Sequence, residues 1–333
     1  MSDGADWRPS ADRGRLAQRA ALMARVREFF AARGVLEVDT PLLVNAPVSD
    51  VHIHSATVRV APDAPSFFLH TSPEYAMKRL LAAGCGDIFQ VCHVVRGFES
   101  GRLHNPEFTL VEWYRLGFSL EQLMGEVDEL VRVMLGLAAT RRRTEHLTYR
   151  EAFVRELSLD PLTASAAQLA QAAAPLGLSA PGSTAAATDT DPAGARDELL
   201  ELLMGARVGP RLGQSALTFV RGYPATQAAL ARLDPADPRT ARRFELYCDG
   251  IELANGFHEL ASAPEQRARF AADNAERARR GLPVHAPDER LLAALAAGLP
   301  DCAGVALGFD RTLMLAAQAA CLDEVLPFPT DRA

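Results

Sequence analysis

The chain has few of the features that mark secreted, membrane or zinc-binding proteins. Its five cysteines are scattered over 333 residues and form no CxxC pair, which disfavours a disulfide framework and a cysteine-based zinc site. No apolar run approaches the roughly 20 residues of a membrane-spanning helix. The N-terminus, MSDGADWRPS, lacks a basic-then-apolar leader. We therefore expect a cytoplasmic protein with reduced thiols.

The chain also lacks an excess of basic residues. Its net charge is -7 and its pI is about 5.7, which disfavours extensive binding of nucleic acid. The short run Arg141–Arg143 is better explained as solvated surface, although an acidic partner could meet it. His52 and His54 have no accompanying cluster of metal ligands and are interpreted as solvent-facing. With 48% hydrophobic and 23% charged residues, the composition is that of an ordinary globular protein.

The most informative stretch runs from Asp87 to Arg115 and predicts a strand over 88–95, a polar loop and a second strand over 108–115. Alternation with period 2 puts four side chains on one face of the second strand: Phe108, Leu110, Glu112 and Tyr114. A core strand would avoid the buried carboxylate. An aromatic ring for a base and Arg96 for a phosphate indicate a nucleotide site. From the residues alone a plainer reading stays open, with Phe108 as core and Arg96 paired with Glu99.

The same stretch resembles motif 2 of the class II aminoacyl-tRNA synthetases in its lysyl form. The matching residues are Arg96, the segment HNPEFT at 104–109 and the run EWY at 112–114. The chain departs from the pattern at Phe98, where the family usually has Glu. The resemblance implies an α+β fold, with an antiparallel sheet flanked by helices, and use of ATP as co-substrate.

Segments near both ends resemble the other two class II motifs. An amphipathic helix over 13–33, a cap at Gly34 and a strand over 35–38 resemble motif 1, which forms a homodimer interface in that family. The segment 304–317 is predicted to be a tight strand that leads into an apolar helix, and it resembles motif 3, where Gly-x-Asp-Arg holds ATP. Each signal is weak alone, but the three in this order are strong together.

The tripeptide Ser72-Pro73-Glu74 predicts a helix start. Ser72 is a good N-cap, Pro73 suits the first turn, and Glu74 complements the helix dipole. These preferences explain the tripeptide as structure alone. In the family the matching residues lie at the amino-acid pocket, which implies that Glu74 receives the substrate ammonium.

A second candidate segment runs from Phe244 to Leu260. Asp249-Gly250 predicts a type I′ hairpin, and a β-bulge at 255–256 would bring Glu252 and Glu259 to one face. Two neighbouring carboxylates suit Mg²⁺, although both could be exposed residues at a strand edge. The matching residues in lysyl-tRNA synthetases line the site for ATP, Mg²⁺ and lysine.

The remaining segments concern organisation. A helix is predicted over 119–137. Residues 163–195 are rich in Ala, Ser, Thr, Pro, Gly and Asp, and we interpret them as a loop-rich insertion, with a mobile loop over 179–194. We expect one catalytic domain over 1–333.

Two features favour one branch of the family. A bacterial lysyl-tRNA synthetase places an OB-fold, anticodon-reading domain before motif 1, whereas here motif 1 begins near the N-terminus, so we expect no anticodon-reading contact with tRNA. Ala306 replaces a common Gly, and its methyl group should suit an amino acid shaped differently from α-lysine. Both features resemble the elongation factor P–(R)-β-lysine ligases, which modify a lysine on elongation factor P.

The resemblance implies a complete site. Arg96 and Arg311 would be catalytic, and Glu252 and Glu259 would hold Mg²⁺. The residues implied at ATP are Arg96, Gly97, Phe98, Glu99, His104, Asn105, Phe108, Glu252, Leu253, Gly308 and Arg311. The residues implied at (R)-β-lysine or lysine are Ser72, Pro73, Glu74, Tyr114, Asn255, Glu259 and Ala306.

Three functions stay open. The leading one is ligation of an amino acid to elongation factor P by a homodimer. The second is aminoacylation of a tRNA or other RNA by a truncated synthetase, which the acidic composition disfavours. The third is a non-catalytic regulator, which Phe98 favours slightly and the presence of Arg96, Glu252, Glu259 and Arg311 disfavours.

Overall fold

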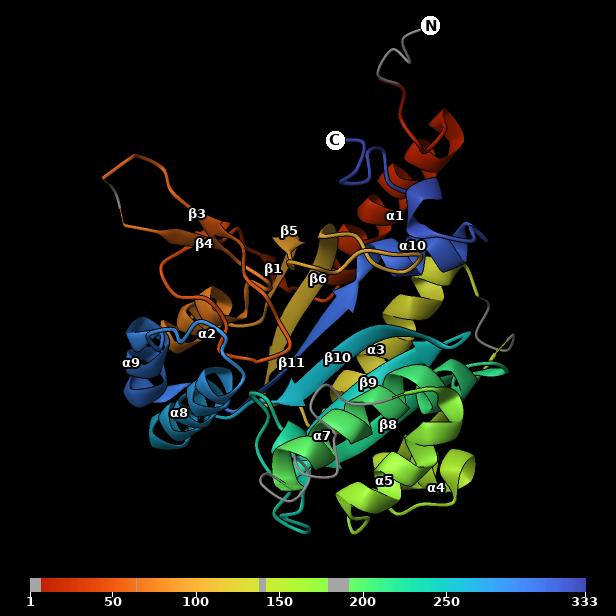
Figure 1. Ribbon diagram of the computed structural model, residues 1–333. Coiled ribbons are helices and arrows are strands. Elements are labelled where there is room, and N and C mark those ends of the chain that lie inside the picture. Colours follow the sequence, from red (N-terminus) through yellow and green to blue (C-terminus); the bar gives the residue numbers. More distant parts are fainter. Residues whose placement is uncertain (1–6, 64, 138–141, 179–191) are drawn as a thin grey trace, which may run out of the picture. The chain divides into compact units, whose positions relative to one another are not determined.

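The computed structural model describes residues 7–63, 65–137, 142–178 and 192–333. The chain divides into two compact units, one formed by Met1–Ala138 with Glu259–Ala333 and the other by Ala139–His258. Figure 1 shows the elements of both. The expected single catalytic domain stays a prediction. None of the helices in the described segments combines the length and apolarity needed to cross a bilayer.

The first unit combines a mostly antiparallel group of strands with helices. The strands β1, β5, β6 and β11 follow one another in that order, and β2, β4 and β3 form a smaller sheet. Its strands are β1 (Leu36–Glu37), β2 (Leu43–Val44), β3 (Thr57–Val58), β4 (Phe67–Leu69), β5 (Ile88–Val95), β6 (Glu107–Leu116) and β11 (Cys302–Gly308). Its helices are α1 (Arg13–Ala31), α2 (Glu74–Ala82), α3 (Leu120–Leu135), α8 (Ala263–Arg279), α9 (Glu289–Gly298) and α10 (Phe309–Ala316).

The predicted strand–loop–strand unit is confirmed, because all of β5 pairs antiparallel with residues 107–114 of β6. β11 pairs antiparallel with the other side of β6, while the short β1 runs parallel to β5. Both faces of β6 are buried over most of their length, so β6 is a central strand of this unit and its register decides which side chains meet.

One face of β6 packs against α1 and α3. The Phe30 ring stacks on Phe89 with centroids 4.4 Å apart and meets Trp113 edge-on at 5.2 Å. The helix α1 ends two residues before the predicted Arg33, and Gly34 adopts a φ of 67° just beyond it. The helix α3 also begins and ends slightly inside its predicted bounds, with Ser119 as its N-cap.

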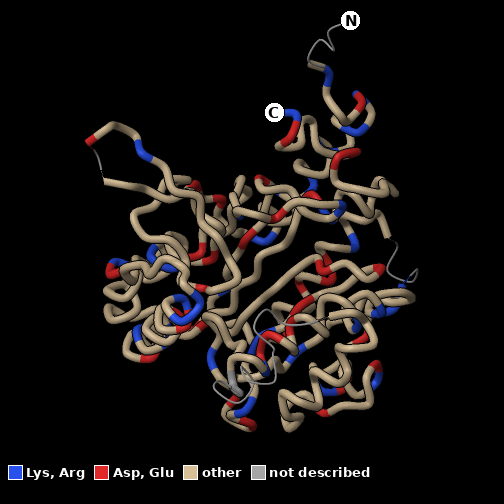
Figure 2. The backbone as a smooth tube through the Cα atoms, in the orientation of Figure 1, with Lys and Arg blue, Asp and Glu red and all other residues tan. Residues whose placement is uncertain are grey.

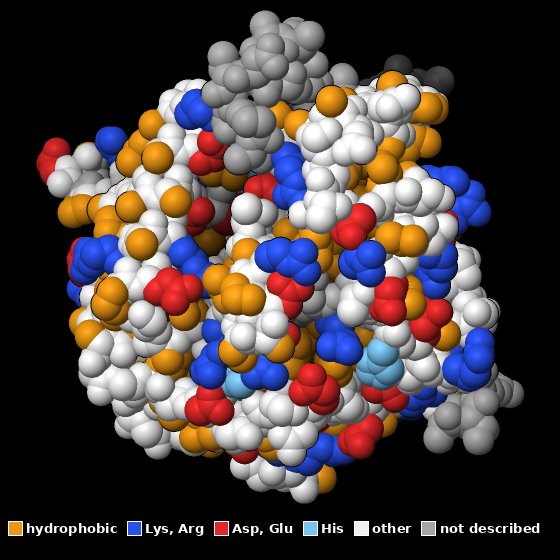
Figure 3. Space-filling model, turned by 90° about the horizontal axis from the view of Figure 1, so that it is seen from below, with side chains coloured by type: hydrophobic (Ala, Val, Ile, Leu, Met, Phe, Trp, Pro, Cys, Tyr) orange, Lys and Arg blue, Asp and Glu red, His pale blue; other side chains and the backbone are white. Residues whose placement is uncertain are grey.

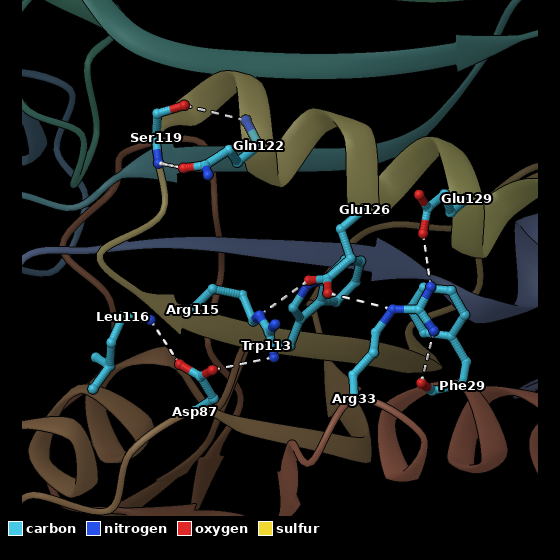
Figure 4. Close-up of polar contacts among 10 residues, drawn as sticks. All are labelled: Phe29, Arg33, Asp87, Trp113, Arg115, Leu116, Ser119, Gln122, Glu126 and Glu129. Carbon is cyan, nitrogen blue, oxygen red and sulfur yellow. Dashed lines mark hydrogen bonds and ion pairs between the residues drawn. The ribbon is translucent and has the colours of Figure 1, made fainter.

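We call the face of β6 that packs against α1 and α3 the back face. There the buried carboxylate of Glu126 on α3 contacts side chains of β6 and the Arg33 side chain (Figure 4). The indole Nε1 of Trp113 donates to Glu126 Oε2 at 3.0 Å. The guanidinium of Arg115 lies 3.5 Å from the same carboxylate, and that of Arg33 lies 3.7 Å from it. Burial raises the pKa of Glu126, and the positive charges of Arg115 and Arg33 oppose that rise. These contacts fix the position of β6 relative to α1 and α3.

The second unit also combines strands and helices. Its strands follow the order β10, β9, β8, β7, with β7 parallel to β8 and the other pairs antiparallel. The helices α4, α5 and α7 gather on one face of β8 and β9 (Figure 1). The elements are β7 (Arg143–Thr148), α4 (Tyr149–Leu157), α5 (Ala166–Ala173), α7 (Pro192–Leu203), β8 (Ala216–Pro224), β9 (Thr240–Cys248) and β10 (Ile251–His258). With both units mixing sheet and helix, the predicted α+β class is confirmed.

The predicted type I′ turn joins β9 to β10. Asp249 and Gly250 have φ values of 51° and 76°, as this turn requires at both central positions. The predicted position of the β-bulge is wrong. The register shifts between Glu252 and Ala254, so Leu253 is the extra residue, and the segment at 255–256 pairs regularly with β9.

The prediction that residues 163–195 form a loop-rich insertion is wrong for residues 166–173. Residues 166–173 form α5, capped by Ser165, because Leu169 and Ala173 are buried in the core of the second unit. Most of the mobile loop predicted over 179–194 lies outside the described residues, as does Arg141.

Candidate active site

The face of β6 opposite α1 and α3 carries the polar side chains that the sequence singled out. The β6–β11 register sets Ala306 opposite Glu112 and Gly304 opposite Tyr114. Directly opposed residues on antiparallel strands project to the same side. Glu112, Tyr114, Gly304 and Ala306 therefore share one face.

A buried lysine joins two of the predicted substrate carboxylates. Lys78 on α2 is 1% exposed. Its Nζ lies 2.7 Å from Glu74 Oε1 and 2.5 Å from Glu259 Oε2. Burial by itself would lower the pKa of Lys78, but the charges and hydrogen bonds of Glu259 and Glu74 outweigh burial and raise the pKa. Lys78 is therefore a permanent cation of this cluster.

A third carboxylate, Glu112, lies in the same neighbourhood with neutral hydrogen-bond donors. The Ser72 hydroxyl donates to its Oε2 and the Tyr114 hydroxyl to its Oε1, both at 2.8 Å. Burial, followed by the negative charge of Glu74, raises the pKa of Glu112 to about 8, although the two hydrogen bonds oppose the rise. Near neutral pH the site therefore favours a proton, or another cation, on Glu112.

The absence of a side chain at Gly304 allows Tyr114 and Glu259 to lie close together. A Cβ at Gly304 would collide with the ring of Tyr114 and would lie 2.6 Å from Glu259 Oε1. The backbone nitrogen of Glu259 donates to the Cys302 carbonyl at 3.0 Å, which fixes this carboxylate beside β11. Glycine at 304 thus lets Tyr114 and Glu259 approach the same strand.

The predicted nucleotide residues meet around the loop between β5 and β6. The guanidinium of Arg96 lies over the Phe108 ring, 5.1 Å from its centroid. Arg311 Nη2 lies 2.8 Å from His104 Nε2, and Arg311 Nε donates to the Leu103 carbonyl at 3.1 Å. Burial and then the positive charge of Arg311 lower the pKa of His104. Two arginines and an aromatic ring at one loop suit an anion with a flat base.

The structure and the known families agree. The model of the class II tRNA synthetases for Asp, Lys and Asn matches residues 4–332. The chain is 51% identical to a Klebsiella pneumoniae protein and 50% identical to a Salmonella typhi protein, each over the full length of both chains. Both relatives are named elongation factor P–(R)-β-lysine ligase.

The chain belongs to the class II aminoacyl-tRNA synthetase family, in the branch of these ligases. The motif 3 residues of this synthetase fold are tied to α1 and β6. Asp310 pairs with Arg19 and accepts from the Thr109 backbone nitrogen at 2.7 Å, while Arg19 donates to the Thr109 hydroxyl at 2.6 Å. These bonds hold the start of α10, and therefore Arg311, close to the loop between β5 and β6.

Several predicted residues of this synthetase site have structural contacts of their own. Both amide atoms of Asn105 are engaged, Nδ2 with the Glu107 carbonyl at 2.6 Å and Oδ1 with the Thr330 nitrogen at 3.0 Å. Phe98 is 91% exposed with a φ of 65°. The Gly97 nitrogen donates to the His54 carbonyl at 2.8 Å. Their roles at ATP, with that of Glu99, stay predictions.

The helix start at Ser72-Pro73-Glu74 differs in detail from its prediction. Pro73, not Ser72, is the N-cap of α2. The Ser72 hydroxyl still accepts from the Glu74 nitrogen at 3.0 Å, and it donates to Glu112. Ser72 thus connects the start of α2 to the carboxylate on β6.

Three of the predicted residues lie on β10 in the second unit. The bulge at Leu253 puts Glu252 and Asn255 on one face of β10, because one extra residue restores the parity of an odd spacing. The Asn255 side-chain oxygen is buried and has no hydrogen-bond partner. In the described ranges, no group of three or more His, Cys, Asp and Glu side chains could hold a metal ion.

Sequence reasoning left three residues out of the candidate site: Lys78, Gly304 and Glu112. The signal for Glu112 was present, because a carboxylate in a strand with two buried faces is unusual. Lys78 carried a weaker signal, since it lies four residues after Glu74 on one helix face. The close approach at Gly304 depends on pairing between β6 and β11 and has no local signature.

Proposed function

We propose that the protein is an ATP-dependent ligase that activates (R)-β-lysine and transfers it to a lysine side chain of elongation factor P. The observation that supports this proposal is a group of three carboxylates, in which Glu74 and Glu259 pair with the buried Lys78 and the charge of Glu74 helps to raise the pKa of the buried Glu112. Its carboxylates outnumber the ammonium group of Lys78, so a ligand that brings two ammonium groups complements it. The particular substrates come from the names of relatives that are about 50% identical over their full length.

Two interactions with the amino acid are proposed. Glu74 and Glu259, held by Lys78, receive one ammonium of the substrate, and Glu112 with Tyr114 receives the other. Burial and then the charge of Glu112 raise the pKa of Tyr114, so Tyr114 stays protonated and acts as a donor. Binding of the second ammonium replaces the proton that Glu112 would otherwise hold. Asn255 is a further residue proposed to bind the amino acid.

In the activation step the substrate carboxylate attacks the α-phosphate of ATP and pyrophosphate leaves. We propose that adenine stacks on Phe108 and that Arg96 and Arg311 bind phosphate oxygens. Fixed positive groups of this kind stabilise the charge that develops at the transferring phosphorus. His104, kept neutral by burial and Arg311, orients Arg311. Gly308 would allow the backbone to approach the nucleotide closely.

Magnesium would accompany ATP and neutralise charge on the departing pyrophosphate. Magnesium in such sites takes one or two carboxylates and several phosphate oxygens or waters, so two carboxylates are enough. Glu252 and Glu259 are the two proposed protein ligands, and Glu259 also pairs with Lys78. Leu253 would pack beside the nucleotide.

In the transfer step the neutral amine of the acceptor lysine attacks the adenylate carbonyl. A new amide bond forms, the bond between that carbonyl carbon and the phosphate oxygen breaks, and AMP leaves. The acceptor ammonium must lose one proton before it attacks and a second proton as the amide forms. A homodimer and a cytoplasmic location are part of the proposal.

The test is amino-acid-dependent ATP–pyrophosphate exchange with (R)-β-lysine and α-lysine separately, followed by mass spectrometry of elongation factor P after incubation with enzyme and ATP. We expect exchange that favours (R)-β-lysine and a gain of one aminoacyl mass on the factor. Exchange with charging of RNA and no gain on the factor would instead support a synthetase acting on RNA. Acidic and basic side chains are interspersed on the face shown in Figure 3, and acidic and basic residues alternate along the backbone in Figure 2, which does not favour RNA binding.

A further inference from the structure

Gln90 is a buried amide on the active-site face that none of the proposed steps uses. It lies on β5, is 1% exposed and stands directly opposite Glu112 in the β5–β6 register. Ala306 stands opposite Glu112 on the other side. Gln90, Glu112 and Ala306 therefore form one transverse row across three neighbouring strands, with all three side chains on the same face.

The amide of Gln90 lacks the partners that buried amides normally have. Neither its Oε1 nor its Nε2 has a hydrogen-bond partner in the structure. A buried polar group left in this state destabilises the folded protein. On the back face the buried Glu126 carboxylate accepts a hydrogen bond from Trp113 and lies near the guanidinium groups of Arg115 and Arg33. The unpaired amide thus lies on the face where the carboxylates also exceed the cations.

The neighbouring thiol indicates that this region is buried and close to Glu112. Burial, followed by the negative charge of Glu112, raises the pKa of Cys92 to about 12, against a smaller lowering by a hydrogen bond that Gln90 would donate to the ionised thiolate. Cys92 therefore stays protonated and uncharged, so Glu112 and not Cys92 can carry negative charge in this region.

We propose that Gln90 is a specificity-determining residue whose side-chain oxygen accepts a hydrogen bond from the same substrate ammonium that neutralises Glu112. This inference rests on the proposed function. An ammonium group has three donors, so a carboxylate alone cannot satisfy it. A neutral acceptor is required at this position, because a carboxylate directly opposite Glu112 would add repulsion between like charges.

The first test is Gln90→Met, which keeps the length of the side chain and removes its polarity. We expect the KM for (R)-β-lysine in pyrophosphate exchange to rise roughly 10-fold or more, since a hydrogen bond to a charged group is lost. The KM for ATP should stay unchanged. The melting temperature should stay the same or rise, because an unpaired buried amide is removed. A fall in melting temperature with an unchanged amino-acid KM would overturn the proposal and make Gln90 a structural amide.

A second variant keeps the proposal testable if Gln90→Met folds poorly. Gln90→Glu adds a carboxylate opposite Glu112 and should move the pH dependence of the amino-acid KM to higher pH. An unchanged pH profile with an unchanged KM would contradict the proposal.

The matched control is Val91→Ala, one residue along β5 and on its other face. It should lower stability without changing either KM. Failure of the proposed function is distinguishable, because wild-type protein would then show no exchange with any lysine-like amino acid. Failure of the Gln90 proposal requires active wild type and an unaffected variant.

Discussion

The two faces of β6 carry buried carboxylates in opposite electrostatic situations. On the back, the Glu126 carboxylate lies near two guanidinium groups and an indole N–H. On the front, Glu74 and Glu259 share Lys78, and Glu112 accepts bonds from neutral hydroxyls. Burial disfavours a charged carboxylate on either face. The back is neutralised by the chain itself and is structural, whereas the front carries three carboxylates and the ammonium group of Lys78 and is suited to a cationic ligand.

The largest effect should come from removing the cation of the front face. In Lys78→Met, Glu74 and Glu259 lose their buried partner. Breaking one side of a buried ion pair typically costs about 3–5 kcal/mol, so we expect a loss of that size in the free energy of unfolding, measured by denaturant titration. Amino-acid activation should be lost as well. Stability close to wild type would mean that Lys78 does not neutralise this cluster.

A pair of matched variants compares the two faces directly. Glu112→Gln should raise the amino-acid KM by roughly 10- to 100-fold, because a hydrogen bond to a charged group is worth about 1.5–3 kcal/mol, and it should not lower stability. Glu126→Gln should lower the free energy of unfolding by about 1–3 kcal/mol and leave both KM values unchanged. Pyrophosphate exchange and chemical denaturation measure the two quantities. If Glu112→Gln and Glu126→Gln changed the amino-acid KM and the free energy of unfolding alike, Glu112 would not be a ligand-binding carboxylate distinct from the structural Glu126.

The pH dependence should sharpen the contrast. Because the pKa of Glu112 is raised from 4.5 to about 8, the folded protein holds a proton that the unfolded chain has lost between these values. Stability contributed by this group is therefore lost as pH rises from about 4.5 to about 8. The amino-acid KM should fall as pH rises from 6 to 8, since an ionised Glu112 binds the ammonium better. Glu112→Gln should remove this part of both profiles, and profiles identical to wild type would contradict the assignment.

The smallest effect concerns the shape of the front face. Ala306 lies opposite Glu112, so Ala306→Gly removes a methyl group next to the carboxylate. A single methyl or methylene in a pocket is worth about 1–3 kcal/mol. We expect the preference for (R)-β-lysine over α-lysine, measured as a ratio of kcat/KM, to fall roughly 10-fold or more. An unchanged ratio would assign the preference to other residues.

Much of the fold could be predicted from local pattern. The strand at 88–95 and the turn at Asp249-Gly250 were predicted correctly, because β-branched runs and the φ demands of a type I′ turn act within a few residues. The bulge was placed at 255–256 although it lies at Leu253. Its position depends on pairing with β9, which local sequence does not reveal. The helix at 166–173 was missed because its buried face becomes apparent only when its packing partners are known.

The family, the order of the three motifs and the residues that could bear charge follow from residue type and spacing alone. Which of these charges are compensated depends on how the chain folds. Lys78 and Glu259 are 181 positions apart, and pairing across β6 and β11 brings Gly304 and Ala306 to Glu112 and Tyr114. Burial and the balance of neighbouring charge are properties of that assembly, and they distinguish the structural carboxylate of Glu126 from the proposed ligand-binding carboxylate of Glu112.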